Sequence, residues 1–322
     1  MLRRLRVVAE FSREYEVGWL GYTLRGVLGY VLREAFCVTG LKCSSCHMAQ
    51  VCPAAYLFET SPACFPPSHR EIASKASGVT KPYVLEPQPA EGRELKFNLI
   101  LIGDARRYEG ILPRILERVG ELGLGRCPRT HERRRFTLKE IKAYNPYTRE
   151  EHTTYSRQRG YNPTPRHIDV TERQLQQRAA QLAKPNITIT LQTPLRLVVQ
   201  GKLMLKPKLH HLLSHLARRY SLIRYYHLWL PPMTPREAKA IAHHARKHTK
   251  STPETAAAKI TRYSIERGRA EQIKAIVGRI KVELAPEFQG KPAQKALKLL
   301  ALAEQIHAGK LTTAGLGQIK IT

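Results

Sequence analysis

The sequence predicts an α+β protein made of two successive βαββαβ units, the ferredoxin-like or RRM-like fold. Alternating apolar residues mark short strands, and apolar residues at a 3.6-residue period mark helices. The same order of elements occurs twice in the 322-residue chain, with a restart at Asn186. We therefore expect an N-terminal domain at residues 1–185 and a C-terminal domain at residues 186–322.

The N-terminal half supplies strand, helix, strand, helix and strand in that order, which is most of a ferredoxin-like fold. The expected strands lie at residues 5–11, 94–102 and 133–141, the helices at 19–36 and 111–122, and an irregular crossing at 82–89. The first helix contains Gly21, Gly26 and Gly29. Each costs about 1 kcal/mol relative to alanine, which predicts that a strand or a ligand approaches this helix closely.

The C-terminal half repeats this architecture without recognisable sequence identity. The expected strands lie at residues 187–191, 193–197 and 277–284, the helices at 209–226, 236–249 and 293–307, and a short strand ends the chain. A basic, polar segment at 145–185 would join the domains, with tyrosines scattered among its arginines. Such a segment is typical of a solvated connection, but aromatic residues among cations also suit single-stranded RNA.

The charge of the chain points to a polyanionic partner. Lys and Arg number 54 against 26 Asp and Glu, which gives a formal charge of +28 and a pI near 10.2. Such an excess destabilises a compact chain by self-repulsion, so nucleic acid is the first candidate partner. A membrane surface is disfavoured because the cations are spread along the chain and no apolar run reaches the roughly 18 residues of a spanning helix.

Other features of the composition indicate where the protein works. The N-terminus alternates like a strand and lacks the continuous apolar stretch of a signal peptide, so we expect a cytoplasmic protein. Abundant arginine, 21 prolines and few asparagines fit a thermophilic source.

Five of the six cysteines follow the first predicted helix closely. Cys43 and Cys46 are separated by two residues and Cys52 follows on a loop, a spacing typical of thiolate metal ligands. The fourth ligand could be Cys37, Cys64 or His47. The set that we expect to hold a metal is Cys37, Cys43, Cys46 and Cys52. Zinc and an iron–sulfur cluster both fit this set, and buried or disulfide-bonded cysteines are the alternative.

A glycine-rich loop precedes the last strand and contains Gly309, Lys310, Gly315 and Gly317. It is not a P-loop, because leucine follows Lys310, no glycine stands five residues before Gly309, and no helix follows. Glycines let a backbone approach a ligand closely, and free N–H groups beside Lys310 would suit an anion. A tight β-turn that requires glycine is the alternative.

Several stretches, taken in order, carry a family resemblance. They are residues 21–33, 43–60, 82–87, 193–196, 262–264 and 309–317, whereas 145–185 and 232–258 match poorly. This ordered set resembles the CRISPR-associated endoribonucleases that process precursor crRNA, members of the repeat-associated mysterious protein (RAMP) superfamily. The resemblance implies two ferredoxin-like domains, CRISPR repeat RNA as the ligand, and RNA cleavage without a metal ion or other cofactor.

The resemblance also implies a mechanism and a set of residues. The ribose 2′-hydroxyl would attack the scissile phosphate in line, which needs a base, an acid and cations for the developing charge. A histidine shortly after the first helix, with tyrosine and lysine helpers, corresponds here to His47, Tyr30 or Tyr22, and Lys42. The RNA-binding residues that we expect are Arg25, Arg33, Arg262, Gly309, Lys310, Gly315 and Gly317.

Two other functions compete with this one. The same superfamily supplies non-catalytic subunits that coat guide RNA in CRISPR effector complexes, so an RNA-binding subunit is the first alternative. A metal-sensing or redox-sensing DNA-binding regulator is the second, and the lack of helix-turn-helix spacing disfavours it. The expected partners are CRISPR repeat RNA or precursor crRNA and other CRISPR-associated proteins, with the chain a monomer or a homodimer.

Overall fold

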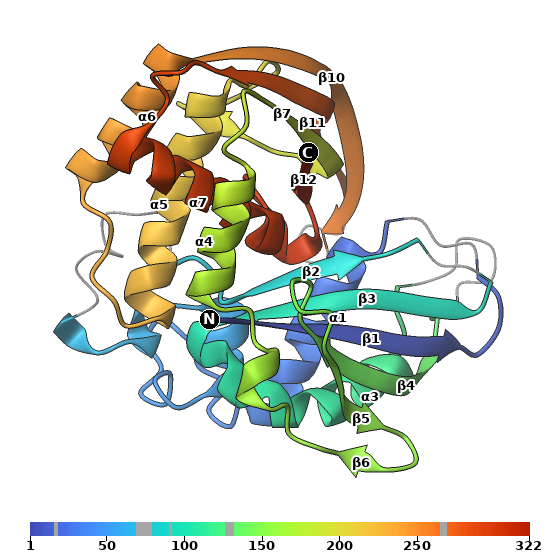
Figure 1. Ribbon diagram of the computed structural model, residues 1–322. Coiled ribbons are helices and arrows are strands. Elements are labelled where there is room, and N and C mark those ends of the chain that lie inside the picture. The colour runs from blue at the N-terminus through green and yellow to red at the C-terminus, as the bar shows by residue number, and fades with distance from the viewer. Residues whose placement is uncertain (16–18, 69–78, 90–91, 126–131, 265–268) are drawn as a thin grey trace. The chain divides into compact units, whose positions relative to one another are not determined.

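The computed structural model describes residues 1–15, 19–68, 79–89, 92–125, 132–264 and 269–322 (Figure 1). The chain divides into two compact units. Unit 1 comprises Met1–Thr171 and Leu222–Leu230, and unit 2 comprises Glu172–Ser221 and Pro231–Thr322. Within the described ranges, no helix is long and apolar enough to cross a membrane.

Unit 1 is built on a six-stranded sheet in the order β2-β3-β1-β4-β5-β6. Its elements are β1 (Leu2–Phe11), α1 (Gly21–Phe36), β2 (Tyr83–Pro87), β3 (Glu94–Ile102), α3 (Leu112–Leu122), β4 (Phe136–Tyr144), β5 (Glu151–Ser156) and β6 (Gly160–Tyr161). The run from β1 to β4 is a βαββαβ unit, with β1 paired antiparallel to both β3 and β4. This is the ferredoxin-like fold, as predicted.

The stretch at 82–89 is a strand rather than an irregular crossing. Residues Tyr83 to Pro87 form β2, and all five are buried. The strand was not predicted because the segment contains Pro87, and proline cannot donate a hydrogen bond to a sheet. β2 lies at the edge of the sheet, where a missing donor is tolerated.

The polar segment at 145–185, expected to be a solvated connection, contains two strands and a helix. It contributes β5 and β6 to the sheet of unit 1 and helix α4 (Glu172–Gln181) to unit 2. Tyr155 of β5 is 8% exposed, and its hydroxyl donates to Oε1 of Glu117 at 2.7 Å. One of the tyrosines considered for RNA stacking is therefore part of the protein interior.

Unit 2 repeats the pattern with a four-stranded sheet in the order β10-β11-β7-β12. Its elements are β7 (Asn186–Leu195), β8 (Val198–Val199), β9 (Lys202–Leu203), α5 (Leu209–His227), α6 (Pro235–His248), β10 (Thr249–Ser264), β11 (Arg269–Leu284), α7 (Gly290–Ile306) and β12 (Ile319–Ile321). The last residues of α5, 222–227, belong to unit 1. The order of β7, α5, β10, β11, α7 and β12 is again βαββαβ, with α6 inserted. The second ferredoxin-like domain is thus confirmed.

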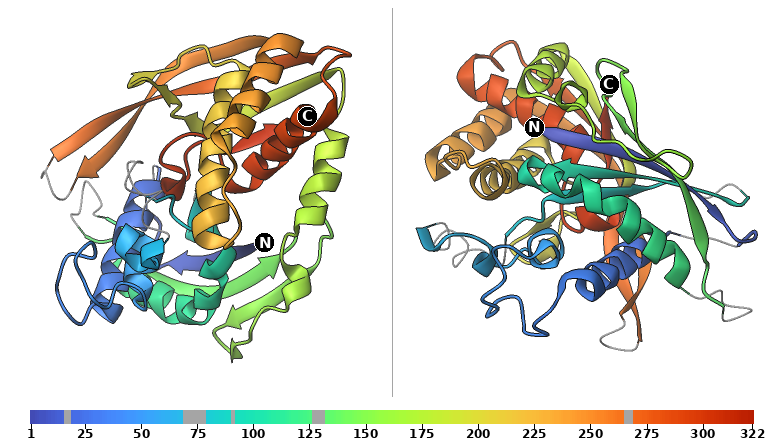
Figure 2. Two further views of the ribbon diagram at one scale, coloured as in Figure 1. Left: turned by 90° about the vertical axis from the view of Figure 1, so that its left-hand side faces the viewer. Right: turned by 90° about the horizontal axis from the view of Figure 1, so that it is seen from below.

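Two features of unit 2 differ from expectation. The strands predicted at 187–191 and 193–197 form one strand, β7. The long strand β10 was not predicted, because alanines, charged residues and Pro253 give it a weak strand signal. β10 pairs with β11 along its whole length, whereas β7 pairs only with residues 276–283 of β11, so the end of the hairpin projects beyond β7 (Figure 2).

Candidate nucleic-acid interface

Helix α1 presents three of the predicted residues away from the core of unit 1. Tyr30 is 61% exposed, Arg33 is exposed in the last turn, and Arg25 is half-buried. Leu24 and Leu28 are buried on the core side of the same helix. The 3.6-residue period thus separates an apolar face from a surface that carries two cations and one aromatic ring.

Phe58 gathers two cations beside this helix. The guanidinium of Arg25 lies 4.9 Å from the centroid of the Phe58 ring, and the ammonium of Lys81 lies 5.6 Å from it. Both distances are within the range of cation–π attraction. The ring rests on α1 at Gly29, where a Cβ would lie 2.0 Å from it. We call Arg25, Gly29, Phe58 and Lys81 the Phe58 cluster.

Lys81 has an unusual environment within this cluster. Its ammonium donates to the carbonyl oxygens of Phe58 and Glu59 at the end of the short helix η1 (Ala55–Glu59). Burial, together with the charge of Arg25, lowers the pKa of Lys81 to about 8. A lysine with such a pKa can exchange a proton near neutral pH. Lys81 is absent from the residues predicted above, since nothing in the local sequence reveals that it is partly buried.

Tyr83 lies fully buried beside the same arginine. Burial raises the pKa of Tyr83 to about 12, and the Arg25 guanidinium acts in the opposite direction. Tyr83 therefore stays protonated at neutral pH.

The structure places the three predicted catalytic residues in unit 1 without bringing their side chains into contact. His47 and Lys42 are exposed in the loop after α1, and Tyr30 points outward from the helix. In the part of the chain that is described, no hydrogen bond or ring contact joins these three side chains. Their roles remain predictions.

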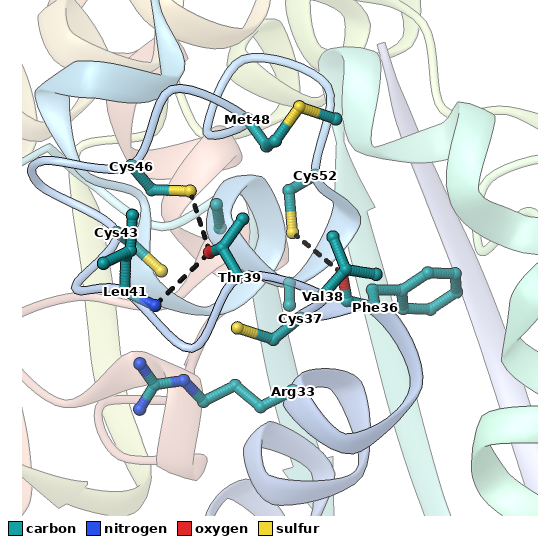
Figure 3. Close-up of a pocket in the computed structure, with 12 residues that line it drawn as sticks. Arg33, Phe36, Cys37, Val38, Thr39, Leu41, Cys43, Cys46, Met48 and Cys52 are labelled. Carbon is teal, nitrogen blue, oxygen red and sulfur yellow. Dashed lines mark hydrogen bonds between the residues drawn. The ribbon is translucent and has the colours of Figure 1, made fainter.

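Four cysteines line one pocket at the end of α1 (Figure 3). They are Cys37, Cys43, Cys46 and Cys52, and the cavity between them and Arg33 holds about 20 Å³. Cys64 does not line it and is buried elsewhere in unit 1, where burial raises its pKa to about 12.

All five described cysteines are free thiols, so none of them forms the disulfide considered as an alternative. The described residues contain no group of three or more His, Cys, Asp or Glu side chains that could hold a metal ion as they stand. The four cysteines predicted to bind a metal thus line one pocket, but their side chains do not form a metal-binding group as they stand.

The glycine-rich loop of unit 2 is a tight turn that uses its own amides. The N–H of Gly317 donates to the carbonyl of Pro194 at 3.0 Å, and the N–H of Gly315 donates to that of Thr312 at 3.0 Å. A Cβ at Gly317 would lie 1.8 Å from the carbonyl oxygen of Ala308. Contrary to expectation, these two amides are not available to an anion, and the glycines serve the turn.

Lys310 is the exposed cation of this loop, and positive groups of α5 lie near it. Arg219 is buried and donates to the carbonyl of His307 at 2.8 Å, and burial lowers its pKa to about 9. Burial and the charges of Arg219, Arg218 and Lys310 lower the pKa of His215 to about 4. We call these four residues, His215, Arg218, Arg219 and Lys310, the Lys310 cluster.

Arg262 forms a salt bridge within the protein. It pairs with Glu271 across the β10–β11 hairpin, with Nη2 and Oε2 2.7 Å apart. An RNA phosphate would have to compete with this carboxylate, so Arg262 is a weaker binding candidate than Lys310 or Arg33.

Comparisons with known proteins agree with this architecture. A family model described as an N-terminal domain matches residues 2–167, and the model of the CRISPR-associated endoribonuclease Cas6 matches residues 189–319. None of the curated protein sequences is similar enough to count as a match.

Solved structures are similar over the whole chain. A Cas6 product complex has a TM-score of 0.56 at 15% identity, covering 100% of both chains. Thermus thermophilus Cas6 has a TM-score of 0.54 at 13% identity, covering 100% of this chain and 98% of that one. A partial Cas6-RT-Cas1–Cas2 complex gives 0.53 at 11% identity, covering 100% of this chain and 46% of that one. At these identities the likeness shows the fold alone.

The two family matches together cover most of the chain, one in each half. The C-terminal part of the chain, residues 189–319, matches the CRISPR-associated Cas6 endoribonuclease family, and the whole chain shares its fold with solved Cas6 structures.

Proposed function

We propose that this protein binds CRISPR repeat RNA and cleaves precursor crRNA without a catalytic metal ion. The observation that carries the proposal is the match of residues 189–319 to the Cas6 endoribonuclease family. The formal charge of +28 supports it, because a polyanion is the partner that such a chain tolerates best.

The proposed reaction is an internal transesterification. The 2′-oxygen attacks the neighbouring phosphorus, the bond to the 5′-oxygen breaks, and the products are a 2′,3′-cyclic phosphate and a 5′-hydroxyl. The 2′-hydroxyl gives up a proton and the leaving 5′-oxygen takes one up, and His47 would serve as acid or base in this transfer. Tyr30 would orient the RNA backbone, and Lys42 would stabilise the developing negative charge. Lys81, with a pKa of about 8, is a further candidate for proton exchange.

RNA binding would use cations of both units. In unit 1 these are Arg25 and Arg33 on α1, and in unit 2 the Lys310 cluster. Such contacts release counterions from RNA, so the affinity should fall steeply with salt. Because one similar solved structure is a Cas6-RT-Cas1–Cas2 assembly, we include other CRISPR-associated proteins among the proposed partners.

An end-labelled repeat transcript tests the reaction. We expect one cut in the presence of EDTA, with product ends that resist ligation until the cyclic phosphate is opened. A transcript with a single 2′-deoxynucleotide before the scissile phosphate should bind equally well and remain whole. Cleavage of the deoxy transcript, or a 5′-phosphate product, would rule out the proposed mechanism.

A non-catalytic RNA-binding subunit is the second candidate function. It is favoured by the lack of mutual contact among the side chains of Tyr30, Lys42 and His47 in the described part of the chain. Tight binding of the unmodified transcript with no cut, at any tested pH and with or without Mg²⁺, would support this alternative over the nuclease.

A further inference from the structure

The loop between α1 and η1 has almost no apolar core of its own. Residues 37–52 form neither helix nor strand. Val38 is 84% exposed, Val51 66% and Leu41 46%, whereas Ala49 is the loop's buried apolar residue at 1%. Burial of apolar side chains therefore contributes little to holding this loop in one conformation.

The cysteines of the same loop lie together. Cys37 ends α1, Cys43 and Cys46 follow in the loop, and Cys52 closes it, yet all four line one pocket (Figure 3). A loop that exposes valine and leucine while it collects four thiols is arranged for a cross-link between sulfurs. Small folded segments without a core commonly use disulfides or a structural metal in this way.

We propose that Cys37, Cys43, Cys46 and Cys52 bind a single Zn²⁺ ion that fixes this loop. Four thiolates in tetrahedral arrangement are a common structural zinc site, with zinc–sulfur distances of about 2.3 Å. The cavity of about 20 Å³ between these residues offers space for one atom or one water, which suits a single ion. Each thiol gives up its proton on binding, so the ion replaces four protons.

Present contacts of the sulfurs are weak enough to be exchanged for metal bonds. Sγ of Cys46 lies 3.3 Å from the Thr39 hydroxyl, and Sγ of Cys52 donates to the carbonyl of Phe36 at 3.8 Å. The four sulfurs do not form a metal-binding group as they stand, so their side chains must rotate toward the ion. Sulfur is a poor hydrogen-bonding atom, so breaking the two present contacts costs little. A zinc ion with four thiolates carries a net charge of −2, and Arg33 lines the same pocket with a compensating charge.

Metal binding to the purified full-length chain tests the proposal. We expect one equivalent of Co²⁺, added to protein freed of metal, to give the intense visible absorption of tetrahedral thiolate coordination, and Zn²⁺ to displace it. The double variant Cys43→Ser/Cys46→Ser should lose this signal. Cys64→Ala, which removes a buried thiol outside the pocket, should keep it.

Thiol counting on the wild-type chain keeps the proposal testable even where the double variant fails to fold. One equivalent of Zn²⁺ should protect four thiols from a thiol reagent. No protection, a loss of the cobalt signal in Cys64→Ala, or bound iron with the colour of a cluster would each overturn the proposal. None of these readouts depends on RNA cleavage, so their failure is distinct from failure of the proposed nuclease function.

Discussion

The ring of Phe58 lies so close to the backbone of Gly29 that a Cβ at position 29 would be 2.0 Å from its tip. This contact places the ring where Arg25 and Lys81 meet it. Gly26, one turn earlier in the same helix, has no such neighbour, because a Cβ there would meet nothing within 4 Å. Gly29 is therefore required by the packing of Phe58, whereas Gly26 has no such packing role and only lowers the stability of the helix.

We expect Gly29→Ala to destabilise the protein by about 1–3 kcal/mol, since the Phe58 ring must leave its position and the cations with it. Gly26→Ala should instead stabilise it by about 0.5–1 kcal/mol, because alanine is the better helix former. Urea unfolding of both variants beside the wild type measures the difference. Equal effects of the two substitutions would show that Phe58 does not depend on Gly29.

His227 predicts an acid sensitivity of unit 1. Its Nε2–H donates to the carbonyl of Thr80 at 2.6 Å, and Nδ1 lies 3.0 Å from the Tyr56 hydroxyl, an arrangement that suits the neutral ring. Burial lowers the pKa of His227 from 6.5 to about 4. Between these values the unfolded chain binds more protons, so stability falls as the pH falls from 6.5 to 4, by roughly 3 kcal/mol in total.

Replacing His227 isolates this effect. His227→Gln should be less stable at neutral pH but should lose less stability than the wild type between pH 6.5 and 4, as measured by urea unfolding at several pH values. His47→Gln, at an exposed position, should keep the wild-type pH dependence. A wild-type slope in His227→Gln would assign the acid sensitivity to other groups.

Local patterns revealed most of the fold. The helical period of α1 and α3 is strong because each helix buries one face, and the second half of β1, residues 6–11, alternates between partly exposed and buried side chains. β10 escaped detection because its pairing with β11, rather than its own residues, makes it a strand. Tertiary pairing of this kind is not encoded within a short window of sequence.

The candidate site was less predictable than the fold. Arg33 and Lys310 could be chosen from the sequence because exposed cations suit a polyanion. Lys81 could not, since its lowered pKa arises from burial and from Arg25, which is distant in the sequence. The amides of Gly315 and Gly317 were expected to face an anion but donate to backbone carbonyls of the protein. A glycine-rich sequence does not tell whether its N–H groups face a ligand or the protein.

Lys310 gives a direct test of the RNA interface in unit 2. Lys310→Ala should weaken binding of the repeat transcript and lower the slope of log affinity against log salt by about 0.7–1, the effect of one phosphate contact. Filter binding at several salt concentrations measures both quantities. Lys310→Arg keeps the charge and should keep the slope, whereas an unchanged slope in Lys310→Ala would remove Lys310 from the interface.

The cations of α1 can be tested in the same assay. Arg25→Gln/Arg33→Gln should reduce the salt slope by about one for each lost phosphate contact. Arg262→Gln is the matched comparison, because the charge of Arg262 is already balanced by Glu271, and its effect should be smaller. A larger effect from Arg262 than from the double variant would move the interface from α1 to the β10–β11 hairpin.

His47→Ala tests the proposed proton exchange. Loss of a general acid or base typically slows a reaction about 10²–10⁴-fold, so single-turnover cleavage should fall by this factor while affinity for the transcript stays unchanged. His243→Ala, at an exposed position on α6, should cleave at the wild-type rate. If His47→Ala still cleaves within threefold of wild type, the rate–pH profile becomes decisive. A bend near pH 8 that disappears in Lys81→Met would then assign the proton exchange to Lys81, because burial and Arg25 lower its pKa into that range.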